Sequence, residues 1–450
     1  MDSRHEQQGP GQLLLLESSK LQEVDMRYAC FGGRDVTGQP LPASIADACS
    51  DFLSRLSRTA PNIHKFNFLC VGDVPPLRFC LSSFVNSMHN LTAFASRTIS
   101  LHPLAIFNLA RLSSLEDLRL IVHDDDWSEE WKDALQGLPE DSFPALGKLD
   151  LLIDDVGLCM AILNHISSRR LWSLALALSG QQSITGVSKC LAILPEQSFV
   201  GLLRKVNLDL SRTASPPSSP PAILYASDLK PLFRLSLTDL VISGCSFAIS
   251  NELIREMSEA WPNIVVLRLM DNKGTSPYSV TLPGLLAFVY NCPLLKELGM
   301  KIDASIFSFP HPLPEMRPAF GAEQRALRML FPGHGLISDP YFVAGFIADC
   351  FPECNCVLSS WSRSPPDFPR DAVAVQGALW NEAWKFVKHF AKVRAQERHG
   401  ALVAGVKMRD PADPAVVLQY AEIHQSNPIE ATRIAIAHGL WYVHMHHPST

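Results

Sequence analysis

The chain has 450 residues, of which 47% are hydrophobic and 19% are charged, and its formal net charge is −6 at pH 7. This composition provides enough apolar side chains for a large core and excludes a mostly disordered protein. The small net charge and the lack of a long basic run argue against a nucleic-acid or membrane-surface partner. No apolar run approaches the ~20 residues that a membrane-spanning helix requires, so we expect no membrane partner.

The number and the sequence surroundings of the cysteines indicate in which cellular compartment the protein lies. There are 11 of them, an odd number, and most lie inside apolar patterns. This distribution is typical of reduced core residues and not of a disulfide framework. The N-terminus is polar, and the apolar stretch at residues 13–16 is far too short for the core of a signal peptide. We therefore expect a cytoplasmic or nuclear protein.

The first segment of the chain is predicted to be a leader. Residues 1–44 carry polar residues, glycine and proline with little periodicity, so we expect little order in them. From residue 45 the pattern changes, because Ile45, Cys49 and Phe52 recur at helical spacing. A strand pattern follows this helix, and the same order then repeats.

The clearest copy of the repeat lies at residues 261–272. Ile264, Leu267 and Leu269 follow the spacing apolar-x-x-apolar-x-apolar, and Asn272 comes three positions later. A strand that turns one edge into a core and then bends at a polar residue has this spacing, which is the phrase of leucine-rich repeats. One strand–helix unit of this kind cannot bury its own apolar face, so the phrase is expected to recur along the chain.

The phrase does recur, at intervals of roughly 29 residues, a length that favours an α-helix on the convex side of each unit. We therefore predict an α/β fold over residues 45–370: a right-handed leucine-rich-repeat solenoid (horseshoe) with a parallel concave sheet and convex helices. The first two apolar anchors of each copy are Ile63/Phe66, Leu91/Phe94, Leu115/Leu118, Leu146/Leu149, Leu171/Leu174, Leu203/Val206, Leu237/Leu240, Ile264/Leu267, Leu295/Leu298, Leu327/Leu330 and a degenerate Cys354/Val357.

Beyond the repeats the pattern becomes purely helical. Apolar residues from Val373 onward follow one long helix without a strand phrase, so we predict a helix at residues 371–400 that caps the last exposed layer of the solenoid. Residues 401–450 hold one or two further apolar helices of unknown role. Residues 211–222, which contain Ser-Pro-Pro-Ser-Ser-Pro-Pro, are expected to form an extended surface loop.

Three clusters have the residue types of a metal site. Residues 124–126 are aspartates, but consecutive side chains point in different directions, so we interpret them as a solvated turn. The thiols of Cys350, Cys354 and Cys356 lack a second Cys or His pair at the required spacing. The C-terminal histidines have ligand chemistry for a transition metal, which leaves a metal-binding protein as an alternative. They are His438, His444, His446 and His447.

No stretch of the sequence indicates a reaction. The Gly-His-Gly turn at residues 333–335 lacks the strand, the later glycine and the lysine of a phosphate-binding loop. Nucleophile and metalloprotease phrases are also missing. We therefore expect no catalytic residue, no cofactor and no enzymatic activity.

The concave sheet is the surface on which we expect a protein partner. In each phrase the two residues between the first anchors, and the one before the third anchor, are predicted to point to the concave side because strand side chains alternate. Solenoids offer such extended faces to partners, and Trp and Arg are frequent interface anchors. Taken singly, each position also fits an ordinary solvated side chain. The candidate partner-binding residues are Arg119, Trp172, Arg204, Lys205, Asp239, Arg268 and Lys296.

Residues 326–352 carry a phrase of the type Leu-x-x-Leu, then Ile-x-Asp-Pro, Val-Ala-x-Phe and Phe-Pro, ahead of a Trp. The residues that fit it are Ile337, Asp339, Pro340, Val343, Ala344, Phe346, Phe351, Pro352 and Trp361. This segment resembles the last repeat of the fungal (basidiomycete) F-box/leucine-rich-repeat proteins. The closing helix around Trp384 and residues 393–398 resembles that family too, and the likeness covers roughly residues 45–400.

The resemblance implies a substrate-recognition subunit of an SCF-type, cullin-based ubiquitin ligase. In that family an N-terminal F-box holds the Skp1 adaptor and the repeats hold the target protein. Residues 1–44 contain no Leu-Pro-x-Glu-Ile/Leu phrase followed by an apolar helix. Binding of Skp1 is therefore expected only if an F-box is present upstream, and no residue here is assigned to it. The alternative is a leucine-rich-repeat scaffold unrelated to ubiquitin, in which the F-box has been lost.

Overall fold

The computed structural model describes residues 21–28, 43–70, 75–122, 137–179, 184–212, 223–271, 280–305, 318–362 and 369–403. The chain divides into two compact units, Met1–Pro217 (unit 1) and Ser218–Thr450 (unit 2). Each unit is built from parallel strands joined by helices or turns, which is the α/β leucine-rich-repeat architecture that the phrase predicts.

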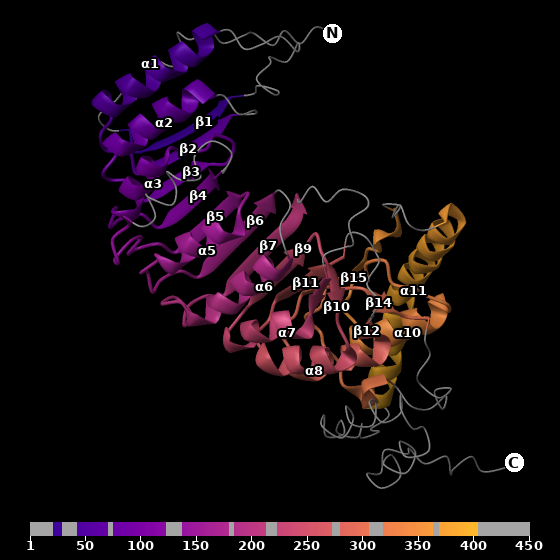
Figure 1. The fold of residues 1–450 in the computed structure, drawn as a ribbon. Coiled ribbons are helices and arrows are strands. Elements are labelled where there is room, and N and C mark those ends of the chain that lie inside the picture. The colour runs from indigo at the N-terminus through magenta and orange to yellow at the C-terminus, as the bar shows by residue number, and fades with distance from the viewer. Residues whose placement is uncertain are drawn as a thin grey trace, which may run out of the picture. The chain divides into compact units, whose positions relative to one another are not determined.

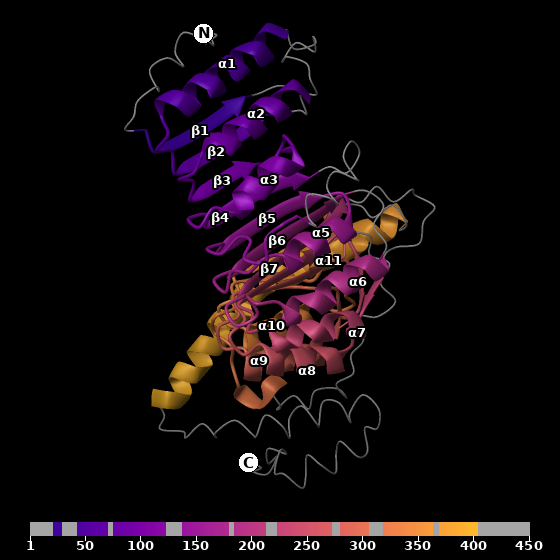
Figure 2. The same ribbon diagram turned by 60° about the vertical axis from the view of Figure 1, so that its left-hand side comes forward.

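Unit 1 contains parallel strands that lie side by side in chain order. The strands are β1 (Glu23–Tyr28), β2 (Lys65–Cys70), β3 (Ala93–Ser96), β4 (Asp117–Val122), β5 (Lys148–Ile153), β6 (Ser173–Ser179) and β7 (Lys205–Arg212). The helices are α1 (Ala43–Thr59), α2 (Pro75–Ser87), α3 (Pro103–Ala110), α5 (Val156–Asn164), α6 (Ile184–Ile193) and the 3-10 turn η2 (Leu194–Glu196). Figures 1 and 2 show these helices on one side of the strands, so the opposite side of the sheet is its helix-free face.

The predicted anchors set the register of the sheet in unit 1. Each second anchor lies opposite the next one on the neighbouring strand, in the order Phe66, Phe94, Leu118, Leu149, Leu174 and Val206. All of these side chains are buried. A buried aliphatic side chain contributes roughly 1.5–3 kcal/mol, and here the adjacent repeat supplies the cover. The predicted spacing is confirmed for these strands.

Short polar side chains begin the helices. The Asp155 carboxylate accepts a hydrogen bond of 2.6 Å from the backbone N–H of Leu158, which caps α5. At α3 the ring nitrogen Nδ1 of His102 accepts from the N–H of Leu104, and Pro103 occupies the first helical position. These caps satisfy donors that no helical carbonyl can reach, and they turn the chain from the strand layer into the helix layer.

The solenoid sheet starts earlier than the sequence predicts. Strand β1 lies inside residues 1–44, for which we expected little order, and it pairs in parallel with β2. Val24 lies opposite Phe66 and is buried, so it acts as the first anchor of the sheet. A strand of this length has only one clear inward apolar residue, and its hydrogen bonds come from a partner about forty residues later. Local periodicity therefore could not reveal it.

Unit 2 continues the same pattern with shorter strands. Its main parallel sheet has the order β9 (Asp239–Ser243), β11 (Val266–Met270), β13 (Glu297–Gly299), β15 (Met329–Phe331) and β16 (Cys356–Val357). Two small parallel pairs accompany it: β8 (Ile223–Tyr225) with β10 (Ser246–Ala248), and β12 (Val280–Thr281) with β14 (Ile302–Asp303). The helical segments are α7 (Ala226–Leu229), η3 (Lys230–Arg234), α8 (Asn251–Ala260), η4 (Leu282–Leu285), α9 (Leu286–Asn291), η5 (Pro318–Gly321), α10 (Pro340–Cys350), η6 (Ser360–Ser362) and α11 (Arg370–Val403).

The anchors are again in register in unit 2. Leu267 pairs with Leu240 on one side and with Leu298 on the other, and the row continues through Leu330 to Val357. The degenerate copy at Cys354 and Val357 is therefore a real strand position, at β16. Its short length fits its place at the end of the order of strands in the main sheet of this unit.

A buried glutamine joins two repeats of unit 2. The Gln324 side chain is 2% exposed, and its Nε2 donates to the carbonyls of Cys292 and Leu295 at 3.0 and 2.9 Å. Its Oε1 accepts from the N–H of Leu327 at 2.8 Å. Three hydrogen bonds thus satisfy a buried amide that would otherwise destabilise the core.

The long C-terminal helix α11 packs on the last repeat of unit 2. The indole N–H groups of Trp361 and Trp380 both donate to the carbonyl oxygen of Gly335, at 3.0 and 2.8 Å. Both indoles are buried. Further along the helix, Arg394 Nε lies 2.9 Å from the buried carboxylate of Asp349 on α10. A helix thus lies where we predicted one at residues 371–400, and it contacts the last repeat; its role as a cap of the solenoid stays a prediction.

Several predicted features lie outside the described residues. They are the bend residue Asn272, the aspartates at residues 124–126, most of the Ser-Pro loop at residues 211–222 and the tail beyond Val403, which includes the C-terminal histidines. Within the described part of the chain, every helix is too short or too polar to cross a membrane.

Candidate interaction surface

The helix-free face of unit 1 carries most of the ion pairs of its sheet. Side chains alternate along each strand, so those next to the buried anchors point away from the helices. In β5 and β6 the alternation is complete, with every second residue buried and the others half-exposed. Charged residues occupy many of the outward positions: Glu23, Asp25, Lys65, Asp117, Arg119, Lys148, Asp150 and Lys205.

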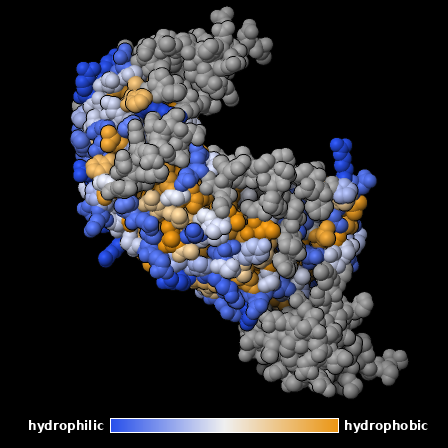
Figure 3. All heavy atoms as spheres, viewed as in Figure 1, coloured by the Kyte–Doolittle hydropathy of each residue, from blue (hydrophilic) through white to orange (hydrophobic). Residues whose placement is uncertain are grey.

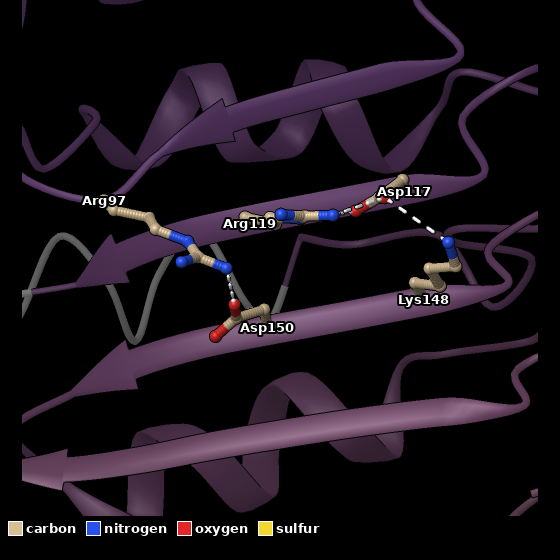
Figure 4. A network of polar contacts seen from close by, with 5 residues as sticks. All are labelled: Arg97, Asp117, Arg119, Lys148 and Asp150. Carbon is tan, nitrogen blue, oxygen red and sulfur yellow. Dashed lines mark hydrogen bonds and ion pairs between the residues drawn. The ribbon is translucent and has the colours of Figure 1, made fainter. Parts of the chain in front are cut away.

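Asp117, Arg119 and Lys148 form the centre of this face (Figure 4). The Arg119 guanidinium donates two hydrogen bonds of 3.0 Å to the Asp117 carboxylate, and these bonds raise the pKa of Arg119 above its ordinary value. The Lys148 ammonium lies 4.0 Å from the same carboxylate. Arg97, just after β3, reaches over β4 and lies 2.5 Å from Asp150 on β5.

These ion pairs organise the surface more than they stabilise the fold. The side chains of Arg97 and Arg119 are 52% and 40% exposed. Exposed ion pairs contribute only about 0–1 kcal/mol each, because water screens them. Their main consequence is that guanidinium and carboxylate groups are held in defined positions before any partner arrives.

A shallow hollow of about 530 Å³ lies over β3 on this face. The small side chains of Ala93 and Ala95 leave room there, and charged residues of β1, β2 and β4 surround it. Both signs of charge line the hollow, since Lys65 pairs with Glu23 at 2.5 Å and Asp117 pairs with Arg119. The hollow therefore has no strong preference for one sign of charge.

Trp172 is an exposed aromatic residue at the N-terminal end of β6. Its side chain is 38% exposed and lies over Gly147, where an added β-carbon would come within 3.4 Å of the indole nitrogen. The ammonium groups of Lys148 and Lys205 lie 5.0 and 6.0 Å from the ring centroid. Both distances fall in the range of cation–π attraction, which holds the two cations beside the ring.

In the described part of unit 2, a comparable arrangement lies around Arg268 on β11. The Arg268 guanidinium forms an ion pair with Glu297 on β13 and lies 4.6 Å from the centre of the Phe331 ring. The aliphatic part of the side chain passes over Gly299, where a β-carbon would come within 3.3 Å of Cγ. The lack of a side chain at Gly299 therefore leaves room for the arginine to lie along the sheet.

The structure divides the seven predicted binding residues into two groups. Arg119, Lys205, Asp239 and Arg268 lie within strands at outward positions. Trp172, Arg204 and Lys296 immediately precede β6, β7 and β13. For the three residues that precede their strands, the concave orientation stays a prediction, because alternation begins only where the extended strand does.

Sequence reasoning missed Arg97, Lys148, Asp150 and Glu297. Lys148 and Glu297 occupy the second position between the first two anchors, and Asp150 directly precedes the third anchor, so the same phrase could have found them. Arg97 carried no such signal, because it follows β3 and reaches its partner on β5 across β4.

The clusters with metal-site chemistry contribute little to this surface. Among the described residues, no group of three or more His, Cys, Asp or Glu side chains is placed to hold a metal ion. Burial raises the pKa of the Cys354 thiol to about 12 and that of Cys350 well above its usual range, so both are protonated core thiols. The Gly-His-Gly segment is a turn, with Gly333 at φ 60°.

Comparisons with known proteins find only remote similarity to solved structures. No protein-family profile matches the chain, and no curated protein matches it. The yeast Rad7 and Elc1 complex contains a chain with 10% identity, covering 77% of this chain and 78% of that one at a TM-score of 0.45. An internalin from Listeria monocytogenes has 13% identity, with 78% and 83% covered and a TM-score of 0.35. The leucine-rich-repeat-containing protein LegL7 from Legionella pneumophila has 13% identity, with 85% and 96% covered and a TM-score of 0.31. The fold assignment for this chain therefore rests on its own strand order and register.

Proposed function

We propose that this protein is a non-catalytic interaction scaffold that holds a protein partner on the helix-free face of its sheet. The observation that carries the proposal is the ordered row of charged and aromatic side chains on that face in unit 1. Arg119 and Lys148 project from the neighbouring strands β4 and β5, and Trp172, just before β6, lies beside Lys148. Extended faces of this kind are what solenoids present to partners.

Two physical features support binding at this face. The side chains are already held by ion pairs and cation–π contacts, so less conformational entropy is lost when a partner binds. Trp172 has a large apolar side chain that is partly exposed to solvent. Tryptophan and arginine are among the residues most enriched in the binding hot spots of interfaces.

A finer role follows from the family resemblance of residues 326–352. We infer a substrate-recognition subunit of an SCF-type ubiquitin ligase, in which the helix-free face would hold the protein to be ubiquitylated. The Skp1 adaptor is a partner only where an F-box accompanies these repeats. The competing role is a scaffold unrelated to ubiquitin.

The two roles separate in a reconstitution with purified Skp1. The chain as given and a version extended upstream in the same gene are each mixed with Skp1 and analysed by size-exclusion chromatography. Co-elution of the extended chain supports the ligase role. If neither chain co-elutes with Skp1, the ligase role is wrong and the scaffold role remains.

A further inference from the structure

The N-terminal ends of β5, β6 and β7 form a cationic cluster around one aromatic ring. The basic edge, as we name it, consists of Lys148, Trp172, Arg204 and Lys205. Backbone bonds keep these residues adjacent, because the N–H groups of Arg204 and Lys205 both donate to the carbonyl of Trp172 at 3.0 Å. The N–H groups of Trp172 and Ser173 donate in the same way to the carbonyl of Gly147.

The charge at this edge is positive on balance. The Asp117 carboxylate nearest to Lys148 already accepts two hydrogen bonds from Arg119, and Lys148 stands 4.0 Å away from it. Asp150, on the same strand as Lys148, is paired with Arg97. Arg169 and Arg170 on the segment leading into β6 are exposed and add to the positive side, whereas Glu116 before β4 is an exposed acid. The side chain of Lys148 remains 44% exposed.

Next to the Trp172 ring, strand β6 presents only small side chains on the helix-free face. The outward residues of β6 are Ser173, Ala175, Ala177 and Ser179, all small and half-exposed. A peptide backbone can therefore approach the strands closely there, with Trp172 standing at one end beside the two ammonium groups. The Trp172 ring offers an apolar contact to a bound peptide, and the ammonium groups of Lys148 and Lys205 beside it offer charge-assisted hydrogen bonds.

We propose that the basic edge binds an acidic peptide segment of the partner protein, with an aliphatic or aromatic side chain of the segment on Trp172 and its carboxylates on Lys148 and Lys205. This inference rests on the proposed function as an interaction scaffold. It adds the chemical class of the bound segment and names the residues that select it.

A nucleic-acid strand fits this edge less well. Asp117, Asp150 and Asp209 lie on the same helix-free face and would repel a phosphate backbone that continued along the sheet. The formal net charge of the chain is −6, whereas nucleic-acid binding usually comes with a strongly basic surface. A short anionic peptide needs only the local cluster.

The test is fluorescence anisotropy of the full chain with short labelled peptides. One peptide alternates Asp or Glu with Leu and Phe, a second replaces every acid by its amide, and a labelled oligothymidylate serves as the nucleic-acid probe. We expect the acidic peptide to bind, with affinity that falls as salt is raised. Binding of the amide peptide should be at least about tenfold weaker, because it lacks the charge-assisted bonds.

Three variants locate the site. Lys148→Glu and Lys205→Glu should each weaken binding of the acidic peptide by about tenfold, and Trp172→Ala should do so by a similar factor. Lys189→Glu is the matched control, because Lys189 is exposed on helix α6 of the same unit. It should leave affinity within about twofold. Thermal unfolding of each variant confirms that its fold is intact.

Four outcomes would overturn the proposal. They are no binding of the acidic peptide, equal binding of the amide peptide, equal weakening by Lys189→Glu, and tighter binding of the oligothymidylate. Because the probes are synthetic, the Skp1 reconstitution does not affect this result. Unchanged affinity of the acidic peptide for the Trp172→Ala, Lys148→Glu and Lys205→Glu variants would likewise refute the basic edge and leave the scaffold role standing.

Discussion

Gly335 is the position at which a single methyl group should detach the C-terminal cap. A β-carbon there would lie 1.8 Å from the carbonyl oxygen of Ile302 and 2.6 Å from its carbon. Contacts under 3.0 Å are essentially never seen for β-carbons, so the Gly335→Ala variant must shift backbone by about 1 Å. The oxygen that both indole N–H groups of Trp361 and Trp380 share would move with it.

The size of the effect follows from those two bonds. Each contributes about 1 kcal/mol net, and a buried N–H left without an acceptor is unfavourable by about 1–3 kcal/mol. With residual backbone strain, we expect Gly335→Ala to lower the free energy of unfolding by about 3–5 kcal/mol, which is at the upper end for a single substitution. The amides of α11 should also exchange with solvent faster than in the unmodified protein.

The assay is urea unfolding followed by tryptophan fluorescence, together with hydrogen exchange of α11. Gly345→Ala is the matched control, since a β-carbon at Gly345 has no neighbour within 4 Å beyond its own helix, α10. Alanine is favoured over glycine inside a helix by about 0.8–1.0 kcal/mol, so this variant should gain stability. If Gly335→Ala unfolds within about 1 kcal/mol of the unmodified protein, the close-contact reasoning is wrong.

Three further predictions concern buried polar groups. Trp380→Phe removes one indole donor and should lower the free energy of unfolding by about 1–2 kcal/mol. Trp384 is half-exposed on the same helix, so Trp384→Phe should change the urea midpoint little. Equal losses of stability in the two variants would contradict the assigned hydrogen bond of Trp380. Gln324→Leu leaves two carbonyls and one N–H without their partner, so it should lower the free energy of unfolding of the protein by about 2–4 kcal/mol. Thermal unfolding measures this loss, and an unchanged midpoint would show that the amide is dispensable. Burial raises the pKa of the Cys292 and Cys354 thiols to about 12, above an unfolded value of about 8.5. The folded chain therefore keeps protons that the unfolded chain loses, so stability is complete below about pH 8.5 and falls as the pH rises toward 12. The loss amounts to at most about 1.4 kcal/mol per pH unit per thiol, and urea midpoints from neutral pH to about pH 10 should fall less when both cysteines are replaced by alanine.

The repeat phrase was a reliable guide because it encodes burial at a fixed spacing. The second anchor of every predicted pair, from Phe66 to Val357, lies within a strand of the structure. An apolar residue at the second anchor position can be buried only if it pairs with its equivalent on the neighbouring strand. The spacing of the anchors along the sequence therefore predicts which residues of neighbouring strands lie opposite each other in the sheet.

The missed features depend on contacts between distant residues. Strand β1 is defined by its bonds to β2, and the six residues of β1 have no distinctive periodicity of their own. The bend at Asp154 contacts Ser179 of the next coil, a pairing that a single repeat does not contain. The local sequence indicates that such residues are polar or extended, but it does not reveal which distant residues they contact.

The helix-free face illustrates the same division. Trp172 and Lys205 were predicted as binding residues from their place in the phrase, whereas Lys148 was not. The structure adds Lys148 because the loop before β6 places the indole over Gly147, directly beside that lysine. The assembled cluster thus depends on the order of three strands and on the one glycine that leaves room for the ring.

The sequence by itself determined the class of fold and the positions of the main-sheet strands after residue 60, because both follow from apolar side chains at regular spacing. Only the tertiary structure decided which charges meet, which carbonyl holds the cap helix and where an aromatic ring lies open to a partner. Those outcomes depend on neighbouring strands coming within about 4.8 Å of one another, and that distance exists only once the chain has folded.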